Sequence, residues 1–512
     1  MLFLNLYVNI KNLRKGVRLK VLFIYPKISK TFWSFSYALK FVSKKAAYPP
    51  LGLLTVSSML PENWEKKLID LNVEKLKEKD LKNVDMVFIG GMQIQKDSAK
   101  EVVRFCKKKG LKIVAGGPLF MVSMEEFEEV DHFILGEAEN IISLFLNDLK
   151  SGNLKKIYSS DDFANLQNSP APDWNLIKFK RYASLSIQYS RGCPYNCDFC
   201  NVTTLFGHKI RTKTKDQIIF ELEKLFENGW RGEVFFVDDN FIGNKRKLKE
   251  EILPSIIEWM KEKDYPFTFN TQVSINLSDD EELINLMVEA GFNSVFIGIE
   301  SPEEKSLIEC HKFQNKGRDL ISSIKKLQRS GLEVAGGFIV GFDNDKPSIF
   351  EKMTKFIQES GIVTAMVGLL NAPKGTKLYK KLLGEKRLTK EITGDNTDFS
   401  LNFIPKMKIE SLLSGYKKII KEIYSPKPYF ERVKKFLKEY KPFKKPHIRL
   451  SYLNAFFKSI YILGLKDNAR FYYWKLFFWS LFRKPKLFSM AITYAIYGYH
   501  FRNVFKKYLQ ND

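Results

Sequence analysis

Three of the chain's five cysteines, Cys193, Cys197 and Cys200, lie close together in the stretch YSRGCPYNCDFCNVTTLFG, in a C-x3-C-x2-C pattern. Cysteine thiolates bind zinc and iron–sulfur clusters. A structural zinc site needs four ligands, and His208, which follows the cysteines, does not have the spacing of a zinc finger. Three thiolates can hold a [4Fe–4S] cluster and leave one iron open for a substrate. The spacing therefore favours an iron–sulfur site over structural zinc.

The composition sets broad limits on the protein. A chain of 512 residues with 45% hydrophobic residues is expected to fold into two or three globular domains. Five cysteines are too few for a disulfide framework, so we expect a reducing, cytoplasmic location, with Cys106 and Cys310 as packing residues. The net charge of +25 predicts an anionic partner, either nucleic acid or a membrane surface. No apolar run is long enough to predict a transmembrane helix.

Apolar strand-like runs alternate with amphipathic segments over residues 20–150, after an N-terminal extension (1–19). This alternation predicts a doubly wound parallel sheet. Several predicted strands end in glycine, which lets a ligand approach the backbone at the carboxyl edge of the sheet. Tight turns are the other explanation for these glycines, and no G-x-G-x-x-G motif supports a dinucleotide site. The predicted strands are KVLFIYP (20–26), KKLIDLNV (66–73), VDMVFIGG (84–91), LKIVAGGP (111–118) and VDHFILGE (130–137).

Six further strand-then-helix units are predicted over residues 183–385, after a proline-containing linker (151–182). They favour a complete or partial (β/α) barrel, in which functional groups gather at the carboxyl ends of the strands. The three clustered cysteines follow the first of these strands. Polar residues at the ends of later strands include Asp238, Asp239, Asn240, Asn270, Gln272, Glu300, Ser301 and Asp343.

Residues 386–512 differ in character and are predicted to be mostly helical. The tail from Lys441 onward is rich in Lys, Arg and aromatic residues, and its only acidic residues are Asp467 and Asp512. Interleaved cations and rings suit a membrane interface or single-stranded nucleic acid. A helical cap, with aromatic residues packed on the barrel, is a third interpretation.

The C-x3-C-x2-C motif after the first strand of a (β/α) barrel resembles the signature of the radical S-adenosylmethionine (SAM) superfamily. The resemblance implies that the three clustered cysteines bind a [4Fe–4S] cluster whose open iron binds SAM. An electron from a donor such as flavodoxin or ferredoxin would then cleave SAM to a 5′-deoxyadenosyl radical. A solvated turn remains an alternative for the Asp238–Asp239 pair. The implied SAM-binding residues are Phe199, Asp238, Asp239, Asn270, Glu300, Ser301 and Gly337.

A doubly wound domain before such a barrel resembles the cobalamin-binding domain of cobalamin-dependent members, and AYPPLGLLTVSSML (47–60) is similar to their loop beside the corrin ring. The D-x-H-x-x-G motif, whose His binds cobalt, is absent, since Asp131–His132 has the wrong spacing. The resemblance thus implies a cobalt without a protein imidazole, with His132 as a packing residue; a domain that has lost its ligand is the alternative. The implied cobalamin-binding residues are Tyr48, Pro49, Leu51, Gly90, Gly91, Gln93, Gly116, Gly117, Gly136 and Glu137.

Further segments, including residues 230–254 and 315–343, are similar to the subfamily that contains hopanoid C-2 methylases and archaeal enzymes that form rings in tetraether lipids. We therefore expect an α/β protein with a Rossmann-like cobalamin-binding domain, a partial (β/α)6 radical SAM barrel and a helical C-terminal region. The expected reaction is methylation of an unactivated sp3 carbon of an isoprenoid-type lipid by way of methylcobalamin. The alternatives are bond or ring formation in a lipid without net methyl transfer, and RNA modification.

Overall fold

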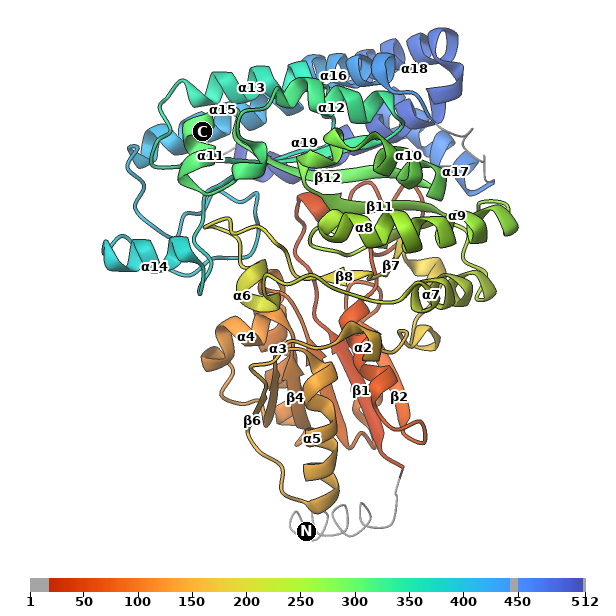
Figure 1. The fold of residues 1–512 in the computed structure, drawn as a ribbon, viewed down its shortest axis with the longest axis vertical. Coiled ribbons are helices and arrows are strands. Elements are labelled where there is room, and N and C mark those ends of the chain that lie inside the picture. Colours follow the sequence, from red (N-terminus) through yellow and green to blue (C-terminus); the bar gives the residue numbers. More distant parts are fainter. Residues whose placement is uncertain (1–17, 443–449, 510–512) are drawn as a thin grey trace.

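The computed structural model describes residues 18–442 and 450–509. A doubly wound domain lies at one end of the molecule, a barrel-like sheet lies in the middle, and a layer of helices covers the other end (Figure 1). Residues 1–17, which form most of the predicted N-terminal extension, lie outside the described part. The predicted α/β fold class is confirmed.

The first sheet has six parallel strands in the order β2-β1-β3-β4-β5-β6. Its two faces form separate cores: α2 (Leu51–Met59) and α5 (Ala138–Ser151) pack on one face, and α3 (Lys96–Lys108) packs on the other. Cover on both faces explains why the strands read as continuous apolar runs. The last strand falls within the range that the sequence predicts to be a linker. The strands are β1 (Lys20–Tyr25), β2 (Glu65–Asp70), β3 (Met86–Gly90), β4 (Lys112–Gly116), β5 (His132–Leu135) and β6 (Ile157–Ser159).

The second sheet also has six parallel strands, in chain order from β7 to β14, and forms the predicted partial barrel. Helices α7 (Lys215–Glu227), α9 (Leu253–Glu262), α10 (Glu281–Ala290), α12 (Leu320–Arg329) and α13 (Ile349–Ser360) follow its strands. The strands are β7 (Ser184–Ile187), β10 (Glu233–Phe236), β11 (Thr268–Val273), β12 (Phe292–Glu300), β13 (Glu333–Val340) and β14 (Ala365–Leu369).

Helix α7 shows how local sequence sets these units. Thr214 and Gln217 form a capping box that satisfies free amide groups at the start of the helix. The helix buries Ile218 and Leu222 on one side, and Gly229, with φ of 77°, lets the chain turn toward β10.

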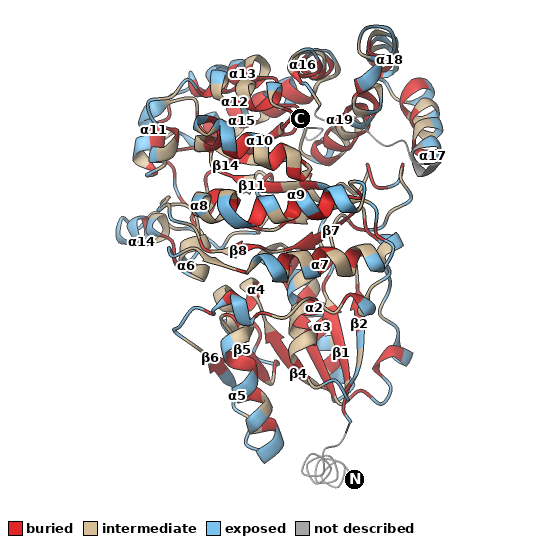
Figure 2. Cartoon of the chain, turned by 45° about the vertical axis from the view of Figure 1, so that its right-hand side comes forward, coloured by how far each residue is buried: buried red, intermediate tan, exposed pale blue. Residues whose placement is uncertain are grey.

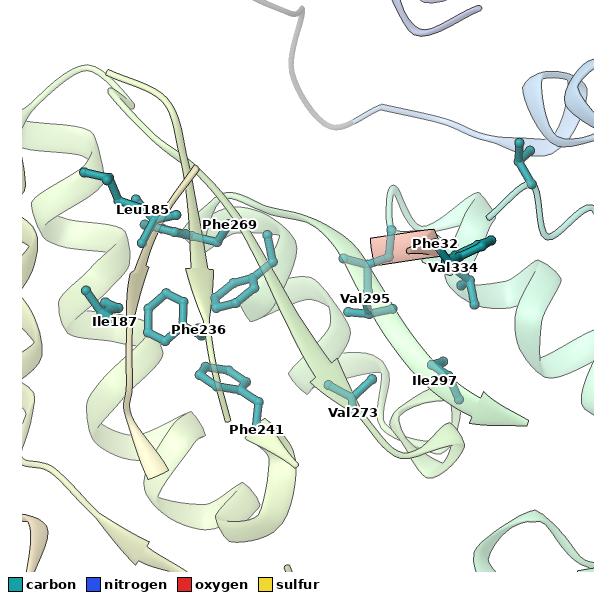
Figure 3. Close-up of a cluster of buried hydrophobic side chains, with 14 of the residues drawn as sticks. Phe32, Leu185, Ile187, Phe236, Phe241, Phe269, Val273, Val295, Ile297 and Val334 are labelled. Carbon is teal, nitrogen blue, oxygen red and sulfur yellow. The ribbon is translucent and has the colours of Figure 1, made fainter. Parts of the chain in front are cut away.

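The two faces of the barrel sheet differ in burial. On the outer face, Leu185, Ile187, Phe236, Phe269 and Val295 are fully buried and form the core drawn in Figure 3. On the inner face, several side chains keep accessible surface. The partly accessible inner-face residues are Glu233, Phe235, Asn270, Gln272, Ser294, Phe296, Glu333 and Met366.

The loop that follows β1 faces this inner surface. The Trp33 ring lies 5.4 Å from the Phe296 ring, and its indole N–H donates to Met366 Sδ over 2.9 Å. The Tyr48 ring lies 5.2 Å from the Phe235 ring. The doubly wound domain therefore contributes part of the barrel's inner lining.

The C-terminal helices divide into two groups. Helices α15 (Ile409–Tyr424), α16 (Pro426–Glu439) and α19 (Phe488–Leu509) pack on the barrel and on the loop after β1. In α19, Phe501 stacks on Phe32 at 4.3 Å, and His500 Nε2 donates to the Phe32 carbonyl over 2.9 Å. Burial lowers the pKa of His500 to about 4, so this imidazole is neutral. Helix α17 (Leu450–Ser459), the π-helical turn η12 (Ile460–Lys466) and α18 (Arg470–Arg483) lie further out (Figure 2).

Within residues 18–442 and 450–509, no helix combines the length and the apolar character that a membrane crossing requires.

Candidate active site

The cysteine loop leaves the carboxyl end of β7. It is framed by a two-stranded ribbon of β8 (Ser190–Arg191) and β9 (Arg211–Thr212). Gly192 starts the loop with φ of 96°, and a Cβ there would lie 2.7 Å from the Lys209 carbonyl oxygen. Only glycine fits this position, because both the space and the backbone angle exclude a side chain.

The two aspartates after β10 have different roles in the structure. Asp238 is fully buried and accepts hydrogen bonds from the Tyr189 amide (3.1 Å), the Ser190 amide and the Ser190 hydroxyl (2.5 Å). Burial raises its pKa to about 7, although these bonds oppose the shift. Because both carboxyl oxygens are engaged, Asp238 anchors the base of the cysteine loop, and its predicted contact with SAM stays a prediction.

Asp239 keeps accessible surface and faces the cysteines. Burial raises its pKa to about 6, opposed by a hydrogen bond from the Gly192 amide and by the charges of Arg191 and Arg211. Of the aspartate pair, Asp239 is therefore the carboxylate that can contact a ligand at the cysteines.

A buried ion pair lies beside the cysteines, and it joins Glu300, which the sequence pointed to, with Lys312, which it did not. Lys312 Nζ lies 2.8 Å from Glu300 Oε1, and both side chains are largely buried. Burial lowers the pKa of Lys312, but the negative charges of Glu300 and Cys197 outweigh it and raise the pKa above its usual range. Gln314 points its amide nitrogen at Cys197 Sγ over 3.8 Å.

Backbone geometry makes room for this pair. Glu300 has φ of 63°, a conformation that non-glycine residues rarely adopt. Gly298 lies beside it, and a Cβ there would collide with the Glu300 carboxyl and lie 2.8 Å from Lys312 Nζ. Strained backbone of this kind concentrates at functional sites. Lys312 and Gln314 follow the short helix α11 (Glu304–Glu309) and carry no motif, so only the fold places them at the cysteines.

The other predicted SAM-binding residues lie at different depths. Phe199, in the cysteine loop, lies 6.4 Å from the Phe342 ring. Ser301 is fully buried, and its hydroxyl accepts from the Glu303 amide over 3.1 Å. Gly337 packs against Phe296 on the inner face. Asn270 lies deeper in the barrel, beside Glu233, and the structure does not bring it to the cysteines.

The donor set fits a [4Fe–4S] cluster. Cys193, Cys197 and Cys200 are unpaired, partly accessible thiols. Burial raises the pKa of all three, that of Cys200 to about 12, so binding of a positively charged metal centre would have to drive their ionisation. In the described part of the chain, no three His, Cys, Asp or Glu side chains lie close enough to hold a single metal ion. The three thiols therefore do not converge as in a mononuclear zinc site.

The glycines predicted to contact cobalamin gather at the carboxyl edge of the first sheet, which faces the barrel (Figure 1). Gly90 and Gly116 are the last residues of β3 and β4, and Gly91, Gly117 and Gly136 follow β3, β4 and β5. A Cβ on Gly116 would lie 2.9 Å from a neighbouring carbonyl oxygen, and Gly117 has φ of 89°. Because these glycines have no side chains, a flat macrocycle could approach the backbone closely at this edge.

Other residues predicted at the cobalamin have partners elsewhere. Glu137 pairs with Arg211 and Arg191 and so ties the first domain to the ribbon beside the cysteines. The Gln93 amide reaches the Ile392 carbonyl over 3.5 Å, and Tyr48 faces the barrel. Pro49 and Leu51 lie at the start of α2. The cobalamin contacts of these residues stay predictions.

The remaining thiols and His132 are packing residues, as expected. Cys106 and Cys310 are buried, at 0% and 4% exposure. His132 lies on β5, and its Nδ1 bonds the Lys155 carbonyl over 2.6 Å.

Three family models match the chain. The B12 binding domain matches residues 42–146, the radical SAM superfamily matches residues 187–357, and a domain of unknown function matches residues 376–512. The first two coincide with the doubly wound domain and the barrel.

Several proteins of known sequence are similar over most of the chain. An uncharacterized methyltransferase of Synechocystis sp. is 38% identical over 492 residues, which is 94% of this chain and 91% of that protein. The hopanoid C-2 methylase of Rhodopseudomonas palustris is 31% identical over 418 residues, or 81% of this chain and 78% of that protein.

Two solved structures share the fold. OxsB, a cobalamin-dependent SAM radical enzyme with aqua-cobalamin bound, has a TM-score of 0.63 at 15% identity and covers 96% of this chain and 80% of its own. The methyltransferase TsrM from Kitasatospora setae, with cobalamin and a [4Fe–4S] cluster bound, has a TM-score of 0.63 at 13% identity and covers 96% of this chain and 100% of its own. The predicted family and cofactors are confirmed: the chain belongs to the cobalamin-dependent radical SAM methyltransferases, which use a [4Fe–4S] cluster, SAM and cobalamin.

Proposed function

We propose that this protein methylates an unactivated sp3 carbon of an isoprenoid-type lipid. The observation that carries the proposal is the apolar part of the barrel's inner face. Phe235, Phe296, Met366, Trp33 and Tyr48 line it with rings and a thioether that keep accessible surface. Such a lining suits an apolar substrate. The likeness to a hopanoid C-2 methylase supports the isoprenoid class.

The residues at the carboxyl edge would hold the cofactors. Cys193, Cys197 and Cys200 would bind the cluster, and Asp239 and the Glu300–Lys312 pair would orient SAM. When bound, the cluster and SAM supply a radical that removes hydrogen from an unreactive carbon, and cobalamin supplies the methyl group. Because such a C–H bond is not acidic, the protein needs no general base there. We propose flavodoxin or ferredoxin as the electron donor.

We also propose that α17, η12 and α18 contact a membrane. Phe457, Phe471 and Phe482 are 64%, 68% and 75% exposed. Exposed cations surround these rings, namely Lys466, Arg470, Lys475, Arg483 and Lys486. Exposed rings among cations match the interface of an anionic bilayer, where rings lie at headgroup depth and cations meet lipid phosphates.

This surface also adjoins the loop that lines the barrel. In α17, Lys458 Nζ donates to the Lys40 carbonyl over 3.2 Å and to the Ser43 hydroxyl over 2.9 Å. A lipid leaving the bilayer beside α17 would therefore meet the loop that carries Trp33 and Tyr48.

Mass spectrometry of total lipids from the source organism, with and without the gene, tests the proposed function. Loss of species one methylene unit heavier supports lipid methylation. Loss of species that differ by two hydrogens points to ring or bond formation instead. An unchanged lipid profile contradicts the proposal and directs the search to RNA and small metabolites.

A further inference from the structure

The deep end of the barrel's inner face is polar, unlike its aromatic middle. Glu233 is the first residue of β10, and Glu333 is the first residue of β13. Asn270 and Ser184 lie beside the Glu233 carboxyl, and Tyr494 of α19 lies beside the Glu333 carboxyl. We call this group, together with Tyr48 and Tyr497, the polar floor; it lies at the opposite end of the strands from the cysteines.

The polar floor is enclosed yet accessible. Glu233, Asn270 and Glu333 keep accessible surface, whereas their neighbours on the outer face are fully buried. Tyr497 of α19 lies close enough to Glu233, Glu333 and Tyr48 for their charges to raise its pKa, in addition to the larger effect of burial. The carboxyls are thus surrounded by strands on one side and by α19 and the loop after β1 on the other.

The two carboxyls have no cationic partner in the described part of the chain. Among residues 18–442 and 450–509, no Lys, Arg or His forms an ion pair with Glu233 or Glu333. Burial raises the pKa of both carboxyls, and that of Glu333 to about 7. Buried carboxyls without a cationic partner are costly, and they are common where a ligand or a reaction uses them.

An independent observation points to a ligand at the same place. Ser186 is 1% exposed, and its hydroxyl has no hydrogen-bond partner within the described residues. Ser186 pairs in register with Phe235, so its side chain lies on the inner face, two residues along β7 from Ser184. A buried hydroxyl without a partner is rare in folded proteins and calls for an explanation such as an absent ligand.

We propose that the polar floor binds a hydroxyl or amino group at the far end of the substrate and thereby selects the carbon that is methylated. This inference rests on the proposed function. At about 3.3 Å per strand residue, Glu233 lies roughly 15 to 20 Å from Asp239 at the cysteine edge. The substrate is then a long molecule with an apolar body and one polar end. Contacts made far from the reacting carbon can fix its position.

Binding of matched probes tests this inference. The reconstituted holoenzyme is titrated with a long isoprenoid alcohol, with the corresponding amine and with the methyl ether of the alcohol, and tryptophan fluorescence reports binding. Trp33 lines the inner face, so Trp33→Phe identifies its part of the signal. Loss of one buried hydrogen bond corresponds to about a tenfold change in Kd. We expect the alcohol or the amine to bind at least that much more tightly than the ether.

Substitutions of the two glutamates test whether the polar floor recognises a hydroxyl group or an amino group. The double variant Glu233→Ala with Glu333→Ala should bind the alcohol and the amine no more tightly than the ether. Glu233→Gln with Glu333→Gln should keep the preference for a hydroxyl over the ether, because the amide still forms hydrogen bonds. It should lose the preference for an amine, because an amide, unlike a carboxyl, cannot ionise to pair with an ammonium group. The control is Glu258→Ala, on the exposed side of α9. Circular dichroism shows whether each variant is folded; if the alanine pair does not fold, the glutamine pair and the probe series decide.

Activity assays separate this inference from the proposed function. If lipids are methylated but parent and variants bind alcohol, amine and ether equally, the polar-floor inference is wrong and the proposed function stands. If the parent discriminates among the probes but forms no methylated lipid, the proposed function fails and the polar floor stands. If the alanine pair raises KM while SAM cleavage and the cluster spectrum stay as in the parent, both are supported.

Discussion

Replacing Lys312 by Met should destabilise the barrel and weaken SAM binding. Lys312 Nζ and Glu300 Oε1 are 2.8 Å apart, with side-chain exposures of 13% and 8%. At an effective dielectric constant of about 20, the attraction between two unit charges at this distance is about 6 kcal/mol. Removing one partner of a buried pair typically costs about 3–5 kcal/mol after relaxation, because the remaining charge stays buried. At about 2–4 °C per kcal/mol, the Tm should fall by roughly 6 to 20 °C.

The assay compares thermal unfolding and SAM binding of the reconstituted proteins under anaerobic conditions. The matched control is Lys305→Met, an exposed lysine of α11 (Glu304–Glu309), which should behave like the parent. The double variant Lys312→Met with Glu300→Gln should regain part of the lost Tm, because it leaves no unpaired charge. A Tm and a SAM affinity equal to those of the parent in Lys312→Met would refute the importance of the pair.

Other changes give equally direct expectations. Cys197→Ala should remove the visible absorbance of the cluster; an unchanged spectrum would contradict the assignment of the three thiols. Gly192→Ala should cost about 1–3 kcal/mol through backbone strain and lower the iron content measured per chain, whereas full iron loading would argue against the role given to this turn. Burial raises the pKa of Glu333 in the folded state to about 7, above its ordinary value of 4.5. Between these two pH values the folded protein binds a proton that the unfolded chain has released, so the contribution of Glu333 to stability is lost as the pH rises from about 4.5 to 7. Between about pH 5 and pH 8, the free energy of unfolding of the parent should therefore fall by up to about 3 kcal/mol more than that of Glu333→Gln. Equal decreases would show that this carboxyl is exposed to solvent. Phe471→Ser with Phe482→Ser should abolish sedimentation with anionic vesicles; persistent binding would exclude the α18 surface.

Much of the fold was predictable because its signals are local. Runs such as 294–301 and 334–342 are apolar, bounded by turn residues and separated by amphipathic helices, so their parallel pairing follows from pattern alone. The three-residue strand β6 is too short to show a hydrophobic pattern in the sequence, and it is a strand only because it pairs with β5. The cysteine site was predictable because its ligands share one short segment.

Residues that reach a site from distant segments were not predictable. Lys312 follows α11, and it comes near Cys197 and Glu300 only after the barrel closes. Charged residues at the starts of strands usually lie at the surface, so Glu233 and Glu333 gave no sign of enclosure. α19 and the loop after β1, which enclose them, lie far from those strands in the sequence.

The sequence left three interpretations of the basic aromatic tail, and the structure divides the tail between two surfaces. In α19, Phe501 and Phe505 are buried against the loop after β1 and α15, as a helical cap requires. In α18, Phe471 and Phe482 remain exposed among cations. Periodicity could not separate the two groups, because α18 and α19 carry aromatic residues on several sides.

The most direct test of the account uses SAM with a deuterated methyl group. The reconstituted holoenzyme, a reductant and a lipid extract from a strain without the gene are incubated anaerobically, and lipids and 5′-deoxyadenosine are measured by mass spectrometry. The account predicts an isoprenoid lipid that carries the labelled methyl group, formed together with 5′-deoxyadenosine and lost in Cys197→Ala. Formation of 5′-deoxyadenosine without label in any lipid would contradict the claim that this protein methylates a lipid.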